Sequence, residues 1–225
     1  MVGLGAVVWA LLVWRWQDPF TWLYTRHQQH VLAQSYEQRR ADVVPRLTRP
    51  LRHQPSAAAE LRSLRRVAQR YRLESHRGEA IGRIRIPRLD LSMILVNGTD
   101  HDSLKRGPGR DIHAYMPGEG QLVYIAGHRT TYLAPFAHID ALRPGDPVTI
   151  ETPYATFFYR ITRHVIVKAN ALWVLRSPGY EVLALQACHP RFFATHRYIA
   201  YARPVRIVPH GARPIVIGRQ HARTA

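Results

Sequence analysis

Three residues in the C-terminal half of the chain have the types and spacing that cysteine catalysis requires. Cys188, the only cysteine among 225 residues, follows the apolar run 181–187, and Arg197 comes nine positions later. His128 lies just past another apolar run, 122–126. A thiolate nucleophile needs a proton-transfer partner and donors for the tetrahedral oxyanion, and a nearby cation lowers the pKa of a thiol. The sequence therefore predicts Cys188 as the nucleophile, His128 as its proton-transfer partner and Arg197 as the anion-stabilising group.

Other histidines compete with His128 for this role. The chain contains 13 histidines, and His189 and His196 lie closer to Cys188 along the sequence. A lone cysteine is also compatible with an inert, buried thiol, and His128 with an ordinary surface position. The residue types alone leave these alternatives open.

The elements that must position these residues are short apolar segments separated by turn signals. Many short strands with few helices predict an all-β fold, a closed β-barrel of about eight strands. Both His128 and Cys188 come at strand ends, where a rigid frame can hold a catalytic pair. The predicted strands are 82–86, 93–96, 122–126, 147–151, 156–167, 181–187 and 197–207, with helical turns at 103–105 and 134–142.

Residues 1–24 are predicted to form a membrane anchor. The run from Val2 to Trp14 is uncharged and apolar, and four of the five tryptophans lie at positions 9, 14, 16 and 22, as in an interfacial aromatic belt. Thirteen helical residues cover about 20 Å, less than the ~30 Å hydrocarbon core. Because no small-residue cleavage site follows, a retained signal-anchor is favoured over a removed signal peptide. A buried N-terminal helix of a soluble protein stays open.

The position of the arginines disagrees with this anchor. They follow the apolar run, and the positive-inside rule would place that flank in the cytoplasm. We expect the true start to lie upstream of Met1, with a basic leader missing from the sequence.

Residues 25–80 are polar and basic and are predicted to form a stalk. Helical spacing is present in His30–Arg40 and Ser56–Leu73, and breaks are expected at Pro45, Pro50 and Pro55. The predicted catalytic domain spans 81–209, and the remainder, 210–225, is predicted to be a tail that forms a weak strand or a disordered arm.

The net charge of +17 favours anionic partners such as phospholipid headgroups. No zinc-finger spacing, RNA-recognition motif or phosphate-binding loop accompanies it, so no nucleic-acid partner is predicted. One cysteine excludes an intrachain disulfide framework and a multi-cysteine zinc site. No acidic cluster is evident, and we expect neither a metal nor another cofactor.

The order of histidine, strand-end cysteine and arginine resembles the sortases, which are membrane-anchored cysteine transpeptidases. The similarity is strongest to the class E, housekeeping-type enzymes of Gram-positive actinobacteria, and it extends over about 81–208. The motifs that carry it are Gly82–Asp90, Leu104-Lys-Arg-Gly-Pro-Gly109, Met116-Pro-Gly-Glu-Gly120, Ile125-Ala-Gly-His-Arg-Thr-Thr-Tyr132, Ala134-Pro-Phe136, Leu142-Arg-Pro-Gly-Asp146 and Cys188-His-Pro-Arg-Phe192 through Arg197.

The resemblance carries the family's catalytic residues onto His128, Cys188 and Arg197. The family's Thr-Leu-x-Thr-Cys strand falls on Ala184–Cys188, so both threonines are alanine here. The second of them helps to position substrate in relatives, which makes Ala187 a predicted substrate-binding position that departs from the pattern. Thr130, Thr131 and Tyr132 are the other predicted substrate-binding residues.

The implied activity is a two-step acyl transfer on the extracellular face of the membrane. Cys188 would cleave a Leu-Pro/Ala-x-Thr-Gly sorting signal between Thr and Gly at the C-terminus of secreted proteins. The thioester would then pass to an amine of a peptidoglycan precursor, and the N-terminal helix would contact membrane lipid. A papain-like hydrolase is less compatible, because His128 precedes Cys188 on a β-rich chain. A non-catalytic scaffold with a sortase fold stays open.

Overall fold

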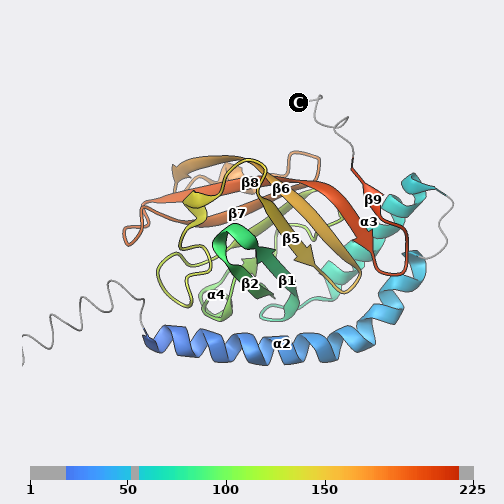
Figure 1. The fold of residues 1–225 in the computed structure, drawn as a ribbon, viewed down its shortest axis with the longest axis horizontal. Coiled ribbons are helices and arrows are strands. Elements are labelled where there is room, and N and C mark those ends of the chain that lie inside the picture. Colours follow the sequence, from blue (N-terminus) through green and yellow to red (C-terminus); the bar gives the residue numbers. More distant parts are fainter. Residues whose placement is uncertain (1–18, 52–55, 218–225) are drawn as a thin grey trace, which may run out of the picture.

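A single sheet of nine strands forms the centre of the molecule (Figure 1). The structure is a computed structural model that describes residues 19–51 and 56–217. The strand order is β6-β5-β1-β2-β3-β4-β7-β8-β9, and β6 also pairs with β8. This extra pairing closes eight strands into a barrel, with β9 outside it on β8. The predicted closed barrel of about eight strands is confirmed.

The strand bounds follow the predicted segments closely. Two of them, Leu122–Ala126 (β4) and Pro147–Glu151 (β5), coincide with the prediction. One strand, β3, was not predicted, because it has only two residues, one of them glycine. The two-residue β9 lies in the tail that was predicted to form a weak strand or a disordered arm. The other strands are Ala80–Ile86 (β1), Leu91–Asn97 (β2), Gly109–Arg110 (β3), Ala155–Lys168 (β6), Val182–His189 (β7), His196–Pro209 (β8) and Ile215–Val216 (β9).

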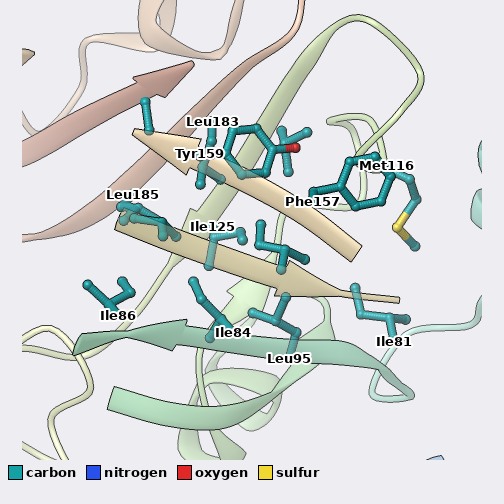
Figure 2. Packing of buried hydrophobic residues seen from close by; sticks show 14 of the residues in the cluster. Ile81, Ile84, Ile86, Leu95, Met116, Ile125, Phe157, Tyr159, Leu183 and Leu185 are labelled. Carbon is teal, nitrogen blue, oxygen red and sulfur yellow. The ribbon is translucent and has the colours of Figure 1, made fainter. Parts of the chain in front are cut away.

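Alternating apolar side chains fill the barrel. Successive side chains of a strand point to opposite faces, so Leu183, Leu185 and Ala187 of β7 point inward together. They meet Ile84 of β1 and Ile125 of β4 in the main core cluster. Figure 2 shows this packing with Tyr159 and Phe157 of β6 covering the same interior. Because the core fixes which face of β7 is inside, the residues between these positions must face outward.

A second apolar layer covers the outer face of β4, β7 and β8. Its members come from these strands, from the loop before β4 and from the connection between β6 and β7, which contains the short helix η4, Leu172–Leu175. These strands are therefore buried on both faces, which explains their nearly continuous apolar sequences. The cluster consists of Ala114, Leu122, Tyr124, Val174, Val182, Ala184, Ile199 and Tyr201.

Two helices precede the barrel. The first, α2, spans Pro19–Thr48 and is much longer than the predicted helix His30–Arg40. Pro45 lies inside α2, so the predicted break there is wrong. Burial of Val43 and Leu47 on either side of this proline holds the last turns of the helix against the core despite the hydrogen bond that proline cannot donate.

The second helix, α3, spans Ala57–Glu74, and the predicted Ser56–Leu73 differs from it by one residue at each end. The Ser56 hydroxyl accepts a hydrogen bond from the Ala59 amide at 3.2 Å and caps the helix. Between the helices, Pro50 lies in the 3-10 turn Arg49–Leu51 (η1), whereas Pro55 falls outside the described residues.

The α2 helix lies along one side of the barrel beside β1, β2 and α4 (Figure 1). Strand β2 pairs with β3 only at Val96 and Asn97, so its earlier backbone groups on that side lack a strand partner. Gln29 takes that place: its Oε1 accepts from the Ile94 amide at 2.7 Å and its Nε2 donates to the Ile94 carbonyl at 3.1 Å. The same Nε2 donates to the Arg106 carbonyl at 2.8 Å. Residues of the predicted stalk thus complete the hydrogen bonding of the barrel.

Short helical turns fill the remaining connections. The predicted turn at 103–105 belongs to α4, His101–Arg106, and the predicted turn at 134–142 contains the 3-10 helix η3, Ile139–Ala141. A further 3-10 turn, Pro87–Leu89 (η2), joins β1 to β2. Most of the predicted anchor, residues 1–18, lies outside the described residues. In the ranges that the structure describes, 19–51 and 56–217, no helix is long and apolar enough to span a bilayer.

Candidate active site

Adjacent strands bring His128 and Cys188 to the same edge of the barrel. Strands β4 and β7 run parallel, with Ala126 paired to Gln186, and the Gly127 amide donates to the Gln186 carbonyl at 3.0 Å. His128 and Cys188 therefore each lie two residues beyond a paired position, on strands about 4.8 Å apart. The parallel register, rather than sequence distance, makes these two residues neighbours.

A glycine is required immediately before His128. A side chain at Gly127 would place its Cβ 2.7 Å from Cδ2 of the Phe136 ring, closer than atoms can approach. Phe136 in turn donates its amide to the His128 carbonyl at 3.1 Å. The packing and the amide of Phe136 thus fix the chain at Gly127 and His128, directly after β4.

Cys188 and Arg197 face each other across β7 and β8. They are direct partners in the antiparallel register of these strands. The guanidinium of Arg197 is held at Nη1, which donates to the carbonyls of Ala194 and His196 at 2.8 and 2.9 Å. Its remaining N–H groups have no hydrogen-bond partner among residues 19–51 and 56–217, so they are available to a substrate oxygen beside the thiol.

His128, Cys188 and Arg197 all line one cavity of about 290 Å³. Cys188 and Gln186 reach it from the outer face of β7, whereas Ala187 between them points into the core. The β6–β7 connection forms the opposite wall, and the lining contains two cationic residues, Lys168 and Arg197, and one acidic residue, Asp111. The lining residues are Thr99, Leu104, Asp111, Tyr124, Ala126, Gly127, His128, Val167, Lys168, Ala169, Ala171, Leu172, Val174, Leu175, Gln186, Cys188 and Arg197.

The environment of His128 favours its neutral form. Burial lowers the pKa of the imidazole below its ordinary value of 6.5, and electrostatic repulsion from His101 lowers it further. Its Nε2 is buried and has no hydrogen-bond partner in the described part of the chain. The ring lies 5.1 Å from the Tyr132 ring, centroid to centroid. A free ring nitrogen beside a thiol can exchange a proton with a bound substrate.

Arg129, the residue after the histidine, ties the two catalytic segments together. Its side chain is only 3% exposed, and its Nη2 forms an ion pair with Asp140 at 2.7 Å. Its Nη1 donates to the carbonyl of Cys188 at 3.2 Å and contacts Nδ1 of His189 at 2.9 Å. Sequence reasoning missed this role, although the short Ile125–Tyr132 motif contains the residue.

The rival histidines point elsewhere. His189 contacts Arg129 as described, and Nδ1 of His196 lies 2.9 Å from the hydroxyl of Thr195. Neither side chain lines the cavity that contains Cys188. The structure therefore brings His128, rather than its rivals, to the thiol-containing cavity.

The predicted substrate-binding residues are not brought to this cavity. Thr130, Thr131 and Tyr132 lie in the loop after His128, outside the cavity lining. Tyr132 reaches toward α2 instead: its amide donates to the Thr21 hydroxyl at 3.3 Å. Ala187 is fully buried in the barrel core.

Several lining residues were not predicted. Gln186 and Tyr124 share the face of Cys188 on adjacent strands, and the Tyr124 hydroxyl donates to Gln186 Oε1 at 3.1 Å. The alternation of β7 could have identified Gln186, because it is two residues from the cysteine. The sequence of η4 shows no alternation that could have placed it beside Cys188. Its position depends on how the long β6–β7 connection folds back over the strands.

No group of three or more potential metal ligands occurs in the described ranges, and whether a metal is used stays a prediction. The fold and the cavity define a general class: a closed β-barrel with a cysteine, a histidine and an arginine at the ends of three neighbouring strands, an arrangement suited to acyl transfer.

The chain belongs to the sortase family. The family model of the Sortase domain matches residues 84–205, more than half of the chain. This range includes β4, β7 and most of β8, and with them all three candidate catalytic residues.

Individual relatives are similar to this chain over the same region. Sortase D of Bacillus subtilis (strain 168) is 32% identical over 132 residues, covering 57% of this chain and 65% of the relative. Sortase SrtE1 of Streptomyces coelicolor is 26% identical over 152 residues, covering 59% of this chain and 42% of the relative. The chain therefore spans less than two thirds of the length of either. The solved structure of a Clostridium perfringens Sortase D5 transpeptidase has a TM-score of 0.56 and 26% identity, covering 61% of this chain and 86% of its own.

Proposed function

We propose that this protein is a sortase-type cysteine transpeptidase with Cys188 as its nucleophile. One observation carries the proposal: His128, Cys188 and Arg197 come from the ends of β4, β7 and β8, and they line the same cavity. The membership of the sortase family supports it, and so does the name of the similar D5 transpeptidase.

The first step forms a thioester. The Cys188 thiolate attacks the carbonyl carbon of the Thr–Gly peptide bond, and the carbonyl oxygen takes up the negative charge. The free N–H groups of Arg197, opposite Cys188 in register, stabilise this oxyanion. As the C–N bond breaks, the His128 imidazolium donates its proton to the leaving amine. The products are a Cys188 thioester, a free glycine amine and a neutral His128.

The second step reverses the proton transfer. An acceptor amine attacks the thioester carbonyl and gives a proton to His128, and Cys188 leaves as a thiolate. Because burial lowers the pKa of His128, the imidazolium that the first step needs is a minor species at neutral pH. The rate then depends on a small population of the correctly protonated pair.

We also propose the finer assignments that the sequence predicts. The enzyme would belong to class E and would act at the extracellular face of the membrane, held there by residues 1–24. Its donors would be secreted proteins with a C-terminal Leu-Pro/Ala-x-Thr-Gly signal, and its acceptor a peptidoglycan-precursor amine. Similarity to SrtE1 supports class E, while the similarity to Sortase D keeps class D as the competing assignment.

A fluorogenic peptide assay tests the activity. Peptides of the Leu-Pro-x-Thr-Gly and Leu-Ala-x-Thr-Gly types are incubated with the full chain, with and without an added amine, and products are identified by mass. We expect an amine-dependent ligation product that Cys188→Ala abolishes and that His128→Ala and Arg197→Ala each reduce by about a hundredfold or more.

The other outcomes identify the alternatives. Cleavage without any ligation product would identify a hydrolase. Inactivity of the folded wild-type chain across a peptide library would favour a non-catalytic scaffold and overturn the proposal.

A further inference from the structure

A second cavity lies on the same outer face of the barrel as the catalytic one. It has a volume of about 160 Å³ and is formed by β4, β6, β7, β8 and the β6–β7 connection. Val174 of η4 lines both cavities and is almost fully buried between them. The second cavity begins near Leu122 and Val182, at the opposite ends of β4 and β7 from His128 and Cys188.

Cationic and aromatic side chains dominate this second cavity. Two cationic residues, Arg163 and Arg176, and three aromatic residues, Trp173, Tyr180 and Tyr201, line it. Trp173 is 52% exposed, although it is the largest side chain of the wall. The lining residues are Leu122, Arg163, Trp173, Val174, Arg176, Pro178, Tyr180, Val182 and Tyr201.

Arg163, which lines the cavity, and Arg203, which lies outside its lining, each pack on an aromatic ring rather than on a carboxylate. The guanidinium carbon of Arg163 lies 4.4 Å from the centre of the Tyr201 ring, and that of Arg203 lies 3.9 Å from the centre of the Tyr180 ring. Stacking covers the flat face of a guanidinium and leaves its N–H edge free for a planar or tetrahedral anion. Within residues 19–51 and 56–217, neither Arg163 nor Arg176 forms an ion pair.

The nearest acidic residue does not neutralise this charge. Glu181 lies between Tyr180 and Val182 in the sequence, but its carboxylate is directed to the other side of β7. There it accepts from the Gly118 and Gly120 amides at 2.9 and 3.1 Å and from the Tyr159 hydroxyl at 2.7 Å. The lining itself, all of it in the described part of the chain, contains no carboxylate.

We propose that this cavity binds the phosphate or diphosphate group of a ligand whose adjoining sugar or glycerol part packs on Trp173. Guanidinium edges suit phosphate oxygens, and an exposed aromatic face suits the carbon side of a polyol. The volume is below the roughly 300–1,000 Å³ of sites that enclose a whole small molecule. The cavity therefore holds one headgroup, and the rest of the ligand extends into solvent.

The position of the cavity gives a further consequence, which rests on the proposed function. Cys188 lies six positions after Val182 on β7, about 20 Å of extended strand. An acceptor that carried its amine and its phosphate group about that far apart would reach the thioester while its phosphate is bound here.

Binding is tested on the full chain with inorganic pyrophosphate in about 0.15 M salt, where diffuse attraction is largely screened. The indole N–H resonance of Trp173, assigned by its absence in Trp173→Phe, reports the location, and calorimetry reports the affinity. We expect saturable binding that shifts this resonance. Arg163→Gln and Arg176→Gln should each weaken the affinity for pyrophosphate about tenfold, because each removes one charge-assisted contact.

Arg206→Gln is the matched control. Arg206 lies on β8 and stacks on Phe158 at 5.4 Å, outside the cavity, so this variant removes the same charge and a similar stacking contact. We expect its affinity to stay within about twofold of the wild type. Thermal denaturation identifies any variant that fails to fold, and the second cavity variant then decides.

Two arms distinguish the sources of the phosphate group. One uses a soluble nucleoside-diphosphate sugar, and the other uses phosphatidylglycerol vesicles compared with phosphatidylcholine vesicles. If the sugar nucleotide or the phosphatidylglycerol vesicles compete with pyrophosphate for binding, and the cavity variants lose this competition, the site is supported. The arm that competes then identifies the source of the phosphate group. Equal weakening by all three arginine variants, or no shift of the Trp173 resonance at saturating pyrophosphate, would overturn it. These binding results do not depend on peptide cleavage, so they stand or fall separately from the proposed function.

Discussion

Replacing Arg129 should damage the active site more than it damages the fold. The buried guanidinium joins the segment after His128 to the carbonyl of Cys188, so its loss frees two catalytic segments at once. We take Arg129→Met as the perturbation, because methionine keeps an unbranched apolar side chain in the buried space.

The structure sets the size of the effect on stability. The hydrogen bond from the charged Arg129 donor to the half-buried Cys188 carbonyl contributes about 1.5–3 kcal/mol. The ion pair adds at most ~1 kcal/mol, because Asp140 is 53% exposed. We expect Arg129→Met to lower the free energy of unfolding by about 2–4 kcal/mol, measured by urea denaturation.

The effect on catalysis should be larger than this loss explains. A displacement of about 1 Å in a catalytic group can cost a hundredfold in rate. We expect kcat with a cleavable sorting peptide to fall about a hundredfold at a temperature where the variant is fully folded, with KM nearly unchanged. Arg129→Lys should restore part of the rate, since an ammonium can reach either Asp140 or the Cys188 carbonyl but cannot bridge both.

Asp140→Asn is the control for the ion pair and should change stability by less than ~1 kcal/mol. If Arg129→Met lowered stability as expected but left kcat within about twofold of the wild type, the guanidinium would be a structural support only, and the positioning argument would be refuted.

Three further predictions concern other parts of the molecule. The lowered pKa of His128 means that the folded state binds fewer protons near pH 6.5 than the unfolded state. The free energy of unfolding should therefore fall as the pH drops below 6.5. When urea denaturation at about pH 8 is compared with that at about pH 5, the fall should be smaller in His128→Asn than in the wild type. An equal fall in both proteins would contradict this. Gln29→Leu should cost about 2–4 kcal/mol by urea denaturation, because it leaves the buried Ile94 amide and carbonyl unpaired; Gln28→Leu, one position away, should cost less than half as much, and equal costs would contradict the role of Gln29. Ala187→Thr restores the family residue but adds a hydroxyl and a methyl group to a fully buried core position, so it should destabilise the fold by about 1–3 kcal/mol with no gain in peptide cleavage; a faster and equally stable variant would refute this.

The longer strands could be predicted because each carries its own signal. The apolar run and the flanking glycine of β4 mark its ends, and the alternation of β7 separates a core face from an outer face without knowledge of any partner strand. The three candidate catalytic residues followed from the same signals, since each comes at or next to a strand end.

The length of α2 could not be predicted in this way. Thr25 and Gln29 occupy buried or half-buried positions in its first half with polar side chains, so the apolar stripe begins only at Leu32. Their partners are backbone groups of β2 and α4, more than sixty residues away in sequence. A helix that completes the hydrogen bonding of a strand needs polar side chains on its buried face, and hydrophobic periodicity misses it for that reason.

The same physical limit accounts for two arginines whose roles sequence reasoning missed, Arg129 at the catalytic site and Arg163 in the second cavity. Arg129 is fixed by its contacts with Asp140 and with the carbonyl of Cys188. Arg163 is fixed by its contact with the ring of Tyr201, its partner in the β6–β8 register. In each case an arginine that would be counted as surface charge is fixed by a partner that only the closed barrel supplies. The arginines that make up the net charge of +17 therefore include two kinds. Arg129 links segments of the fold, whereas Arg163 presents N–H groups to a ligand. Only the tertiary partners separate them, which is why exchanging Arg163 and Arg206 individually for glutamine is a sharper test of a binding site than any change in total charge.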